Sequence, residues 1–222
     1  GCLSPEGRAL IVNGGVWGQR WVDICRTNDL PFEEIKLAPG TTVEPSDIEA
    51  RLMGGSLDAL LINGHETSTG VLYDLPAIGE IARRHNALFI VDAISTIGAD
   101  EFQMDDWGID VAILSSQKAL ALPPGLSFVA AGPKADKAHE TAELRTNYTD
   151  WTFRQGPEHY QKYCGTPPEP LLFAFHKALD LIFEEGLEKT WHRHALLGEA
   201  TRRAVAVWAE KGAVDFNITD AH

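Results

Sequence analysis

Asp92 and Lys118 are the two residues whose types and positions could do chemistry together. Asp92 directly follows an apolar run at 88–91, and Lys118 lies in the segment 115–120 that follows a second run at 111–114. Both runs are continuous rather than alternating, which is typical of buried parallel strands. The carboxyl ends of such strands meet at one edge of an open α/β sheet, where ligands bind. We therefore expect both side chains at that edge.

This pair suits pyridoxal phosphate chemistry. The amine of a lysine can form a Schiff base with the carbonyl group of the cofactor, and a carboxylate can hold a protonated pyridine nitrogen. A lysine at a strand end is also commonly a solvated side chain without such a role, so Lys118 alone leaves both interpretations open.

Three further segments are expected beside this pair. The turn 63–70 carries three hydroxyls, a carboxylate and an imidazole, which could bind a ring substituent or only the backbone of the turn. The loop 14–20 places glycines around Trp17, whose ring could cover a planar cofactor or pack in the core. The side chains and amides of 115–117 could bind phosphate oxygens or orient the lysine.

Length and charge limit the possible partners. The 222-residue chain corresponds to one large domain, or to one domain and part of another. Its formal net charge of −13 disfavours nucleic acid and anionic membranes as general partners, although backbone donors could still bind a small anion. No apolar run is long enough to cross a membrane, and no signal peptide is recognisable. We therefore expect a cytoplasmic protein.

The cysteines and histidines do not indicate a metal site. The three cysteines, Cys2, Cys25 and Cys164, lack metal-ligand spacing, and their odd number favours a reduced, intracellular setting. His192 and His194 are two positions apart, so on a helix they would face different directions. We expect no bound metal.

Strand and helix patterns alternate along the first part of the chain. Strands are predicted at 9–12, 34–37, 58–62, 88–91, 111–114 and 126–130, and helices at 17–26, 44–53 and 75–84. This alternation predicts an α/β fold with a mainly parallel sheet and helices on both faces. No clear period is present from 135 to 163, and 169–211 is predicted to form long amphipathic helices with a break near Gly186.

Five segments together resemble a known family. They are 15–20, 64–70, 91–98, 116–125 and 163–167. In this order they strongly resemble the class V aminotransferases of pyridoxal phosphate fold type I, and most closely the alanine–glyoxylate and serine–glyoxylate group. The resemblance covers nearly the whole chain, and the segments are far more specific together than any one of them alone.

The resemblance implies roles for five residues around a cofactor ring. Lys118 would hold pyridoxal 5'-phosphate as an internal aldimine, and Asp92 would pair with its pyridinium nitrogen. Thr67 would hydrogen-bond near the phenolic oxygen of the ring. Trp17 would stack on one face of the ring, and Ile94 would pack against the other. Once displaced by the substrate amine, Lys118 would be the catalytic residue that moves the proton from the substrate Cα.

The same resemblance implies phosphate contacts and a dimer. Gln117 would contact the phosphate of the cofactor. Tyr163 and Thr166 would reach the phosphate of the neighbouring subunit, which implies a homodimer with shared active sites.

The resemblance also implies that the chain is a fragment of a larger enzyme. Residues 1–165 would be the cofactor-binding large domain without its N-terminal part, and 166–222 would be a helical connection and the start of a truncated small domain. A phosphate-binding loop at a helix N-terminus is expected upstream, and the arginine that binds the substrate carboxylate is expected downstream. Arg193, Arg202 and Arg203 lie in the wrong segment to be that arginine.

The expected reaction moves an amino group from a small amino acid, alanine or serine, to a 2-oxo acid, glyoxylate or pyruvate. One alternative within the same fold is 2-aminoethylphosphonate–pyruvate transamination. Cysteine desulfurases share the fold, but they usually place a histidine directly before the lysine, where this chain has Gln117. A catalytically silent, truncated paralogue is a further alternative, because both expected ends are absent.

Overall fold

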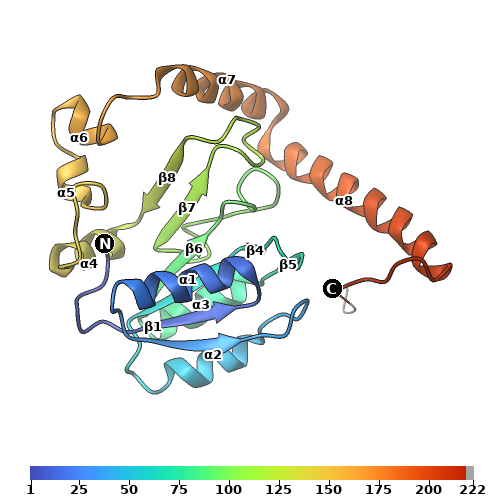
Figure 1. Cartoon of the computed structure of the whole chain (residues 1–222), viewed down its shortest axis with the longest axis horizontal. Coiled ribbons are helices and arrows are strands. Elements are labelled where there is room, and N and C mark those ends of the chain that lie inside the picture. Colours follow the sequence, from blue (N-terminus) through green and yellow to red (C-terminus); the bar gives the residue numbers. More distant parts are fainter. Residues whose placement is uncertain (219–222) are drawn as a thin grey trace.

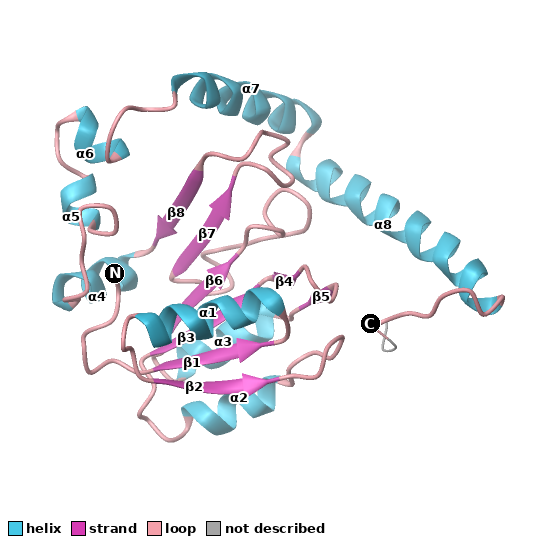
Figure 2. Cartoon of the chain, in the orientation of Figure 1, coloured by secondary structure: helices cyan, strands magenta, loops and turns pink. Residues whose placement is uncertain are grey.

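The computed structural model of the chain describes residues 1–218 and contains one six-stranded sheet (Figures 1 and 2). Its strands, in spatial order, are β2 (Phe32–Lys36), β1 (Ala9–Asn13), β3 (Ala59–Asn63), β6 (Leu88–Asp92), β7 (Val111–Ser115) and β8 (Ser127–Ala131). All neighbours run parallel except β8, which is antiparallel to β7. The prediction of a mainly parallel sheet is therefore confirmed. A separate antiparallel pair is formed by β4 (His65–Glu66) and β5 (Val71–Leu72).

Helices cover both faces of this sheet, as predicted (Figure 1). The helices of the described chain are α1 (Val16–Thr27), α2 (Pro45–Leu52), α3 (Leu75–Arg84), α4 (Pro133–Thr141), α5 (Trp151–Arg154), α6 (His159–Tyr163), α7 (Glu169–Glu185) and α8 (Leu187–Glu210), and α1 to α4 pack on the sheet. Ile48 of α2 and Ile78 of α3 belong to one buried cluster. Val22 of α1 and Ala135 of α4 belong to a second cluster on the opposite face.

The inner strands are buried on both faces, which explains their continuous apolar runs. In β1, Leu10 and Val12 join the cluster under α2 and α3, whereas Ile11 joins the cluster under α1. Polar residues stand only where these strands end. Asn63 at the end of β3 is the register partner of Asp92 at the end of β6, so both lie at the carboxyl edge of the sheet.

The segment 135–163, which lacks a clear period, forms most of α4 and two very short helices, α5 and α6. Helices of four and five residues give too few turns for a periodic apolar pattern. Their ends are instead fixed by capping. The Asp150 carboxylate accepts hydrogen bonds from the backbone N–H groups at the start of α5, and Glu158 and Gln161 form a capping box in α6.

The long helices α7 and α8 extend beyond the sheet (Figure 1). They are separated by Gly186, whose φ of 91° favours glycine, and this confirms the predicted break. Phe175 of α7 packs on Phe128 of β8 with ring centroids 4.6 Å apart. Large apolar side chains of α8, including Leu196 and Trp208, remain exposed. Among residues 1–218, no helix combines the length and apolar character needed to traverse a bilayer.

Candidate active site

The Asp92 carboxylate is held in place at the end of β6. Its Oδ1 accepts a hydrogen bond from the Ile94 N–H at 3.0 Å, and its Oδ2 accepts one from Asn63 Nδ2 at 3.2 Å. Burial raises the pKa of the Asp92 carboxyl group above its ordinary value; the Ile94 N–H opposes this shift, the Glu66 carboxylate adds to it, and the Lys118 ammonium opposes it.

Lys118 projects from the loop after β7, where its side chain is exposed. The loop is closed by a hydrogen bond from the Ala121 N–H to the Lys118 carbonyl at 2.9 Å. It also packs closely against the loop after β6, because a Cβ added at Gly98 would lie 3.1 Å from Ala119 Cβ. The loops that carry Asp92 and Lys118 are thus neighbours.

The buried side chain of Ser116 stabilises this loop through hydrogen bonds to its backbone. It is fully buried, and its Oγ donates to the Pro123 carbonyl at 2.8 Å and accepts from the Leu126 N–H at 3.2 Å. The Ser116 hydroxyl is thus already bound to backbone groups of the loop that carries Lys118. Gln117 is exposed beside Lys118.

The turn after β3 is joined to the loop after β6. Thr67 Oγ1 and Ser95 Oγ share a hydrogen bond of 2.7 Å. The imidazole of His65 lies between two oxygens, with Nδ1 3.2 Å from the Ser95 carbonyl and Nε2 3.1 Å from Asp100 Oδ2. Thr67 is therefore held beside the segment that carries Ile94, which is half-buried.

Trp17 lies in the first turn of α1 with 42% of its surface exposed. The alternative interpretation of Trp17 as a core residue is therefore wrong, because a core indole would be enclosed. Its backbone N–H points to Glu66 Oε1 at 3.4 Å. The loops after β1, β3, β6 and β7 thus bring Trp17, Thr67, Asp92 and Lys118 to the same edge of the sheet.

Glu66 is a buried polar residue of this edge to which the sequence alone assigned no role. Its side chain is fully buried, and its carboxylate accepts from the Gly18 N–H at 2.8 Å and from the Ser68 Oγ at 2.6 Å. The sequence offered one indication of this role, because Glu66 is a carboxylate in a turn that is rich in hydroxyl groups. Its partners Trp17 and Gly18, however, lie in α1, far away along the chain.

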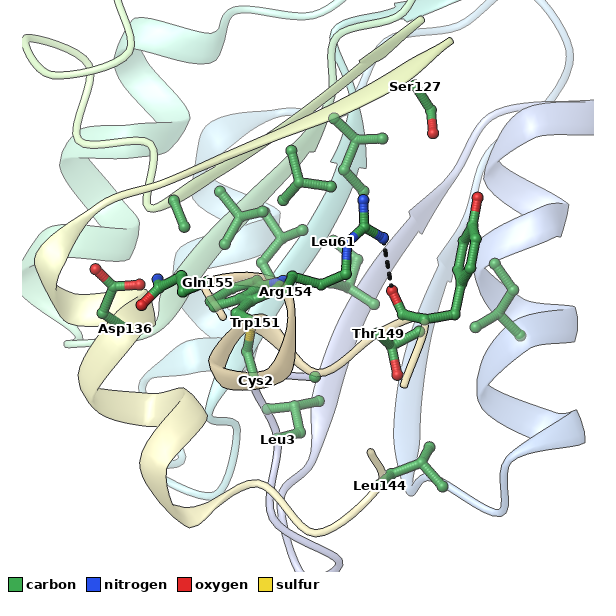
Figure 3. A pocket seen from close by; sticks show the side chains of 18 of the residues that line it. Cys2, Leu3, Leu61, Ser127, Asp136, Leu144, Thr149, Trp151, Arg154 and Gln155 are labelled. Atoms are coloured by element: carbon green, nitrogen blue, oxygen red, sulfur yellow. Dashed lines mark hydrogen bonds between the residues drawn. The ribbon is translucent and has the colours of Figure 1, made fainter. Parts of the chain in front are cut away.

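Tyr163 has different surroundings from these residues, and Thr166 is exposed in the loop between α6 and α7. Tyr163 ends α6 and lines a cavity of about 820 Å³ that also contacts β8 and the second half of α1. Figure 3 shows this cavity, where Arg154 Nη1 donates to the Tyr148 carbonyl at 3.2 Å. Among the described residues that line it, none is Trp17, Thr67, Asp92 or Lys118.

The cysteines stand apart from the candidate site. All three are free, and burial raises the pKa of the Cys2 and Cys25 thiols, both of which line the same cavity as Tyr163. Within the part of the chain that the structure describes, no three His, Cys, Asp or Glu side chains gather where they could hold a metal ion.

Comparison with known proteins supplies the family. Residues 1–208 match the family model described as aminotransferase class-V. The chain belongs to this family. It is 38% identical to the serine–glyoxylate aminotransferase of Methylorubrum extorquens, over 94% of the chain and 54% of the relative. It is also 39% identical to a protein named soluble hydrogenase, small subunit, of a Synechococcus species, over 91% of the chain and 54% of the relative.

A solved structure confirms the fold. The alanine–glyoxylate aminotransferase of a Nostoc species superposes with a TM-score of 0.81 at 28% identity, over 87% of this chain and 52% of that structure. The resemblance identified from the five sequence segments is thus confirmed at the level of family and fold. The chain spans about half the length of the curated relatives it matches.

Proposed function

We propose that the chain forms part of a pyridoxal-phosphate-dependent aminotransferase. It would move an amino group from a small amino acid, alanine or serine, to a 2-oxo acid, glyoxylate or pyruvate. The observation that carries this proposal is geometric: Asp92 ends β6, Lys118 follows the neighbouring strand β7, and the loops after these two strands pack against each other at Gly98 and Ala119. Family membership supports it, although the two relatives carry names of different activities. The choice of transamination therefore rests on the family and on the relatives named aminotransferases, because an aspartate and a lysine at this edge would also serve other reactions of the cofactor.

The side chains at this edge fit the cofactor chemically. The Asp92 carboxylate has about four lone-pair sites and uses two of them for Asn63 and Ile94, so it can accept a further N–H from a pyridinium. The Lys118 amine is exposed and can reach an aldehyde. Thr67 offers a hydroxyl, and Trp17 offers an exposed aromatic face. Together they suit a flat heterocycle with a basic nitrogen at one end and a carbonyl at the other.

When bound, pyridoxal phosphate supplies an electron sink for the charge that develops at the substrate Cα. Asp92 would keep the ring nitrogen protonated through a charge-assisted hydrogen bond. Lys118 Nζ would hold the cofactor covalently until the substrate amine replaces it. The free amine would then accept the proton from the substrate Cα and donate it to C4′ of the cofactor. An arginine could not do this, because it does not release its proton.

The three remaining residues, Gln117, Tyr163 and Thr166, would contact cofactor phosphate groups. Gln117, exposed beside Lys118, would contact the cofactor phosphate. Tyr163 and Thr166 would contact the phosphate held by the other subunit of a homodimer. Their exposure, and the position of Tyr163 at a cavity that does not include the Asp92 edge, support a role outside their own chain. Residues 1–165 would form the large domain, and 166–222 would lead to the small domain.

A spectrum tests this proposal directly. Pyridoxal phosphate is added to the purified chain, and the visible absorbance band of the covalent lysine adduct is recorded for the wild type, Lys118→Ala and Lys137→Ala. Lys137 is a matched control, because it is an exposed lysine on α4. A band that Lys118→Ala alone loses supports the proposal. A band that survives in Lys118→Ala contradicts it, and its absence from all three proteins favours the silent paralogue.

A further inference from the structure

Glu66 is a fully buried carboxylate that the proposed chemistry does not use. A buried ionised group is costly unless hydrogen bonds compensate for lost water. Here four donors surround it: the Gly18 N–H at 2.8 Å, the Trp17 N–H at 3.4 Å, the Ser68 N–H at 3.1 Å and the Ser68 Oγ at 2.6 Å. Since an ionised carboxylate only accepts, all four contacts match its charged form.

These contacts join two segments of the candidate site. Ser68 belongs to the turn after β3, next to Thr67, whereas Trp17 and Gly18 belong to the first turn of α1. Ser68 Oγ extends the link, because it also accepts from the Val16 N–H at 3.0 Å. The first N–H groups of a helix have no partner within the helix, so in this turn the side chains of Glu66 and Ser68 take that place.

Glycine allows this close approach. A Cβ added at Gly15 would collide with Ser68 Oγ and would lie 2.7 Å from the Glu66 carboxyl carbon. A Cβ added at Gly18 would lie 2.7 Å from the Cα of Asn13. Both glycines flank Trp17, so the position of its backbone depends on this tight fit against the turn after β3.

We propose that Glu66 is a positioning residue that fixes Trp17, through the first turn of α1, against the face of the cofactor ring. This inference rests on the proposed function, because the ring that Trp17 covers belongs to the cofactor. Glu66 itself touches neither the ring nor the reacting atoms. It acts by holding the backbone amides of Trp17 and Gly18, which sets where the indole stands.

Amide hydrogen exchange tests the link without any cofactor. Exchange is compared at residues 14–20 in the wild type, Glu66→Gln and Glu44→Gln. Glu44 is the matched control, because it is a glutamate at the start of α2 whose side chain makes no cap hydrogen bond. Loss of a hydrogen bond to a charged group predicts an exchange increase of about tenfold at Trp17 and Gly18 in Glu66→Gln alone. Unchanged exchange at these amides overturns the proposal.

A double-mutant cycle tests whether Glu66 acts through Trp17. Pyridoxal phosphate affinity is measured for the wild type, Glu66→Gln, Trp17→Ala and the double variant. We expect Glu66→Gln to raise the dissociation constant about tenfold in the wild type, and to change it less than about twofold when Trp17 is already absent. A direct effect of the Glu66 charge on Asp92 would survive in the Trp17→Ala background. An equal loss in both backgrounds therefore refutes positioning.

Two further results are informative in their own right. If the wild type binds no pyridoxal phosphate, the proposed function fails for this chain, and the exchange measurement alone decides whether Glu66 caps α1. If Glu66→Gln does not fold, Ser68→Ala replaces it. This variant removes the hydroxyl between Val16 and Glu66, and it must raise exchange at 16–18 for the proposal to stand.

Discussion

Replacing Asp92 by asparagine is the most direct test of the charge at the end of β6. The amide keeps the shape of the carboxylate and can still accept from the Ile94 N–H, which now binds Oδ1 at 3.0 Å. It also faces Asn63, which now donates from Nδ2 and would turn its amide over to present Oδ1, buried without a partner, to the new NH2 group. The substitution should therefore remove the charge with little disturbance of the fold.

The expected loss follows from the hydrogen bond to the ring nitrogen. A hydrogen bond to a charged group contributes about 1.5–3 kcal/mol. Because about 1.4 kcal/mol corresponds to a factor of ten in rate, removing the charge should slow the half-reaction by about tenfold to about 150-fold. Attachment of the cofactor to Lys118 should persist, since the aldehyde lies at the other end of the ring.

The assay is single-turnover spectroscopy with alanine or serine as donor. The visible band of the cofactor adduct is followed after mixing, for the wild type, Asp92→Asn and Asp105→Asn. Asp105 is an exposed carboxylate and serves as the control. If Asp92→Asn converts at the wild-type rate with the band present, Asp92 does not hold the ring nitrogen, and the assignment of the site is wrong.

Three further predictions concern stability. The pKa of Asp92 is raised in the folded chain, so the ionised carboxylate opposes folding at neutral pH. Asp92→Asn should therefore raise the melting temperature of the cofactor-free chain at pH 7. This gain should disappear below the ordinary pKa of an aspartate, near 4, because the carboxyl group is then protonated in both the folded and the unfolded chain. Melting curves at pH 7 and pH 3 check this, and an equal gain at both would contradict it. Ser116→Ala should lower the free energy of unfolding by about 1–3 kcal/mol, because the Leu126 N–H loses its partner; urea denaturation that shows no change would exclude a bracing role. Gly18→Ala should cost about 1–3 kcal/mol, because its Cβ would crowd the Cα of Asn13; a more stable variant in the same assay would show that this contact relaxes freely.

The positions of Asp92 and Lys118 could be predicted because they depend on local patterns. A continuous apolar run predicts an inner parallel strand, and the residue that ends the run must lie at the sheet edge. The break at Gly186 was likewise predicted from a local signal, a glycine within an amphipathic helical pattern. These features need only the neighbouring residues in the chain, so one sequence contains enough information to place them.

Glu66 and Trp17 show where local reasoning ends. The sequence could not decide whether Trp17 packs in the core or stays exposed, because that depends on where α1 begins relative to the turn after β3. The contact that fixes this joins Glu66 to Gly18 across 48 positions of the chain. A periodic pattern in either segment does not record such a contact. The short helices α5 and α6 were missed because capping, and not periodicity, defines them.

The four loops of the candidate site are braced by contacts that need no ligand. Asn63 and Ile94 hold the Asp92 carboxylate, Ser116 holds the lysine loop, and Glu66 holds the first turn of α1. Since these groups are already ordered, binding of a rigid ring would cost little additional conformational entropy in the backbone. The Lys118 side chain, by contrast, is exposed. That division suits the proposed reaction, in which the ring must stay fixed while the lysine amine leaves the cofactor and carries a proton.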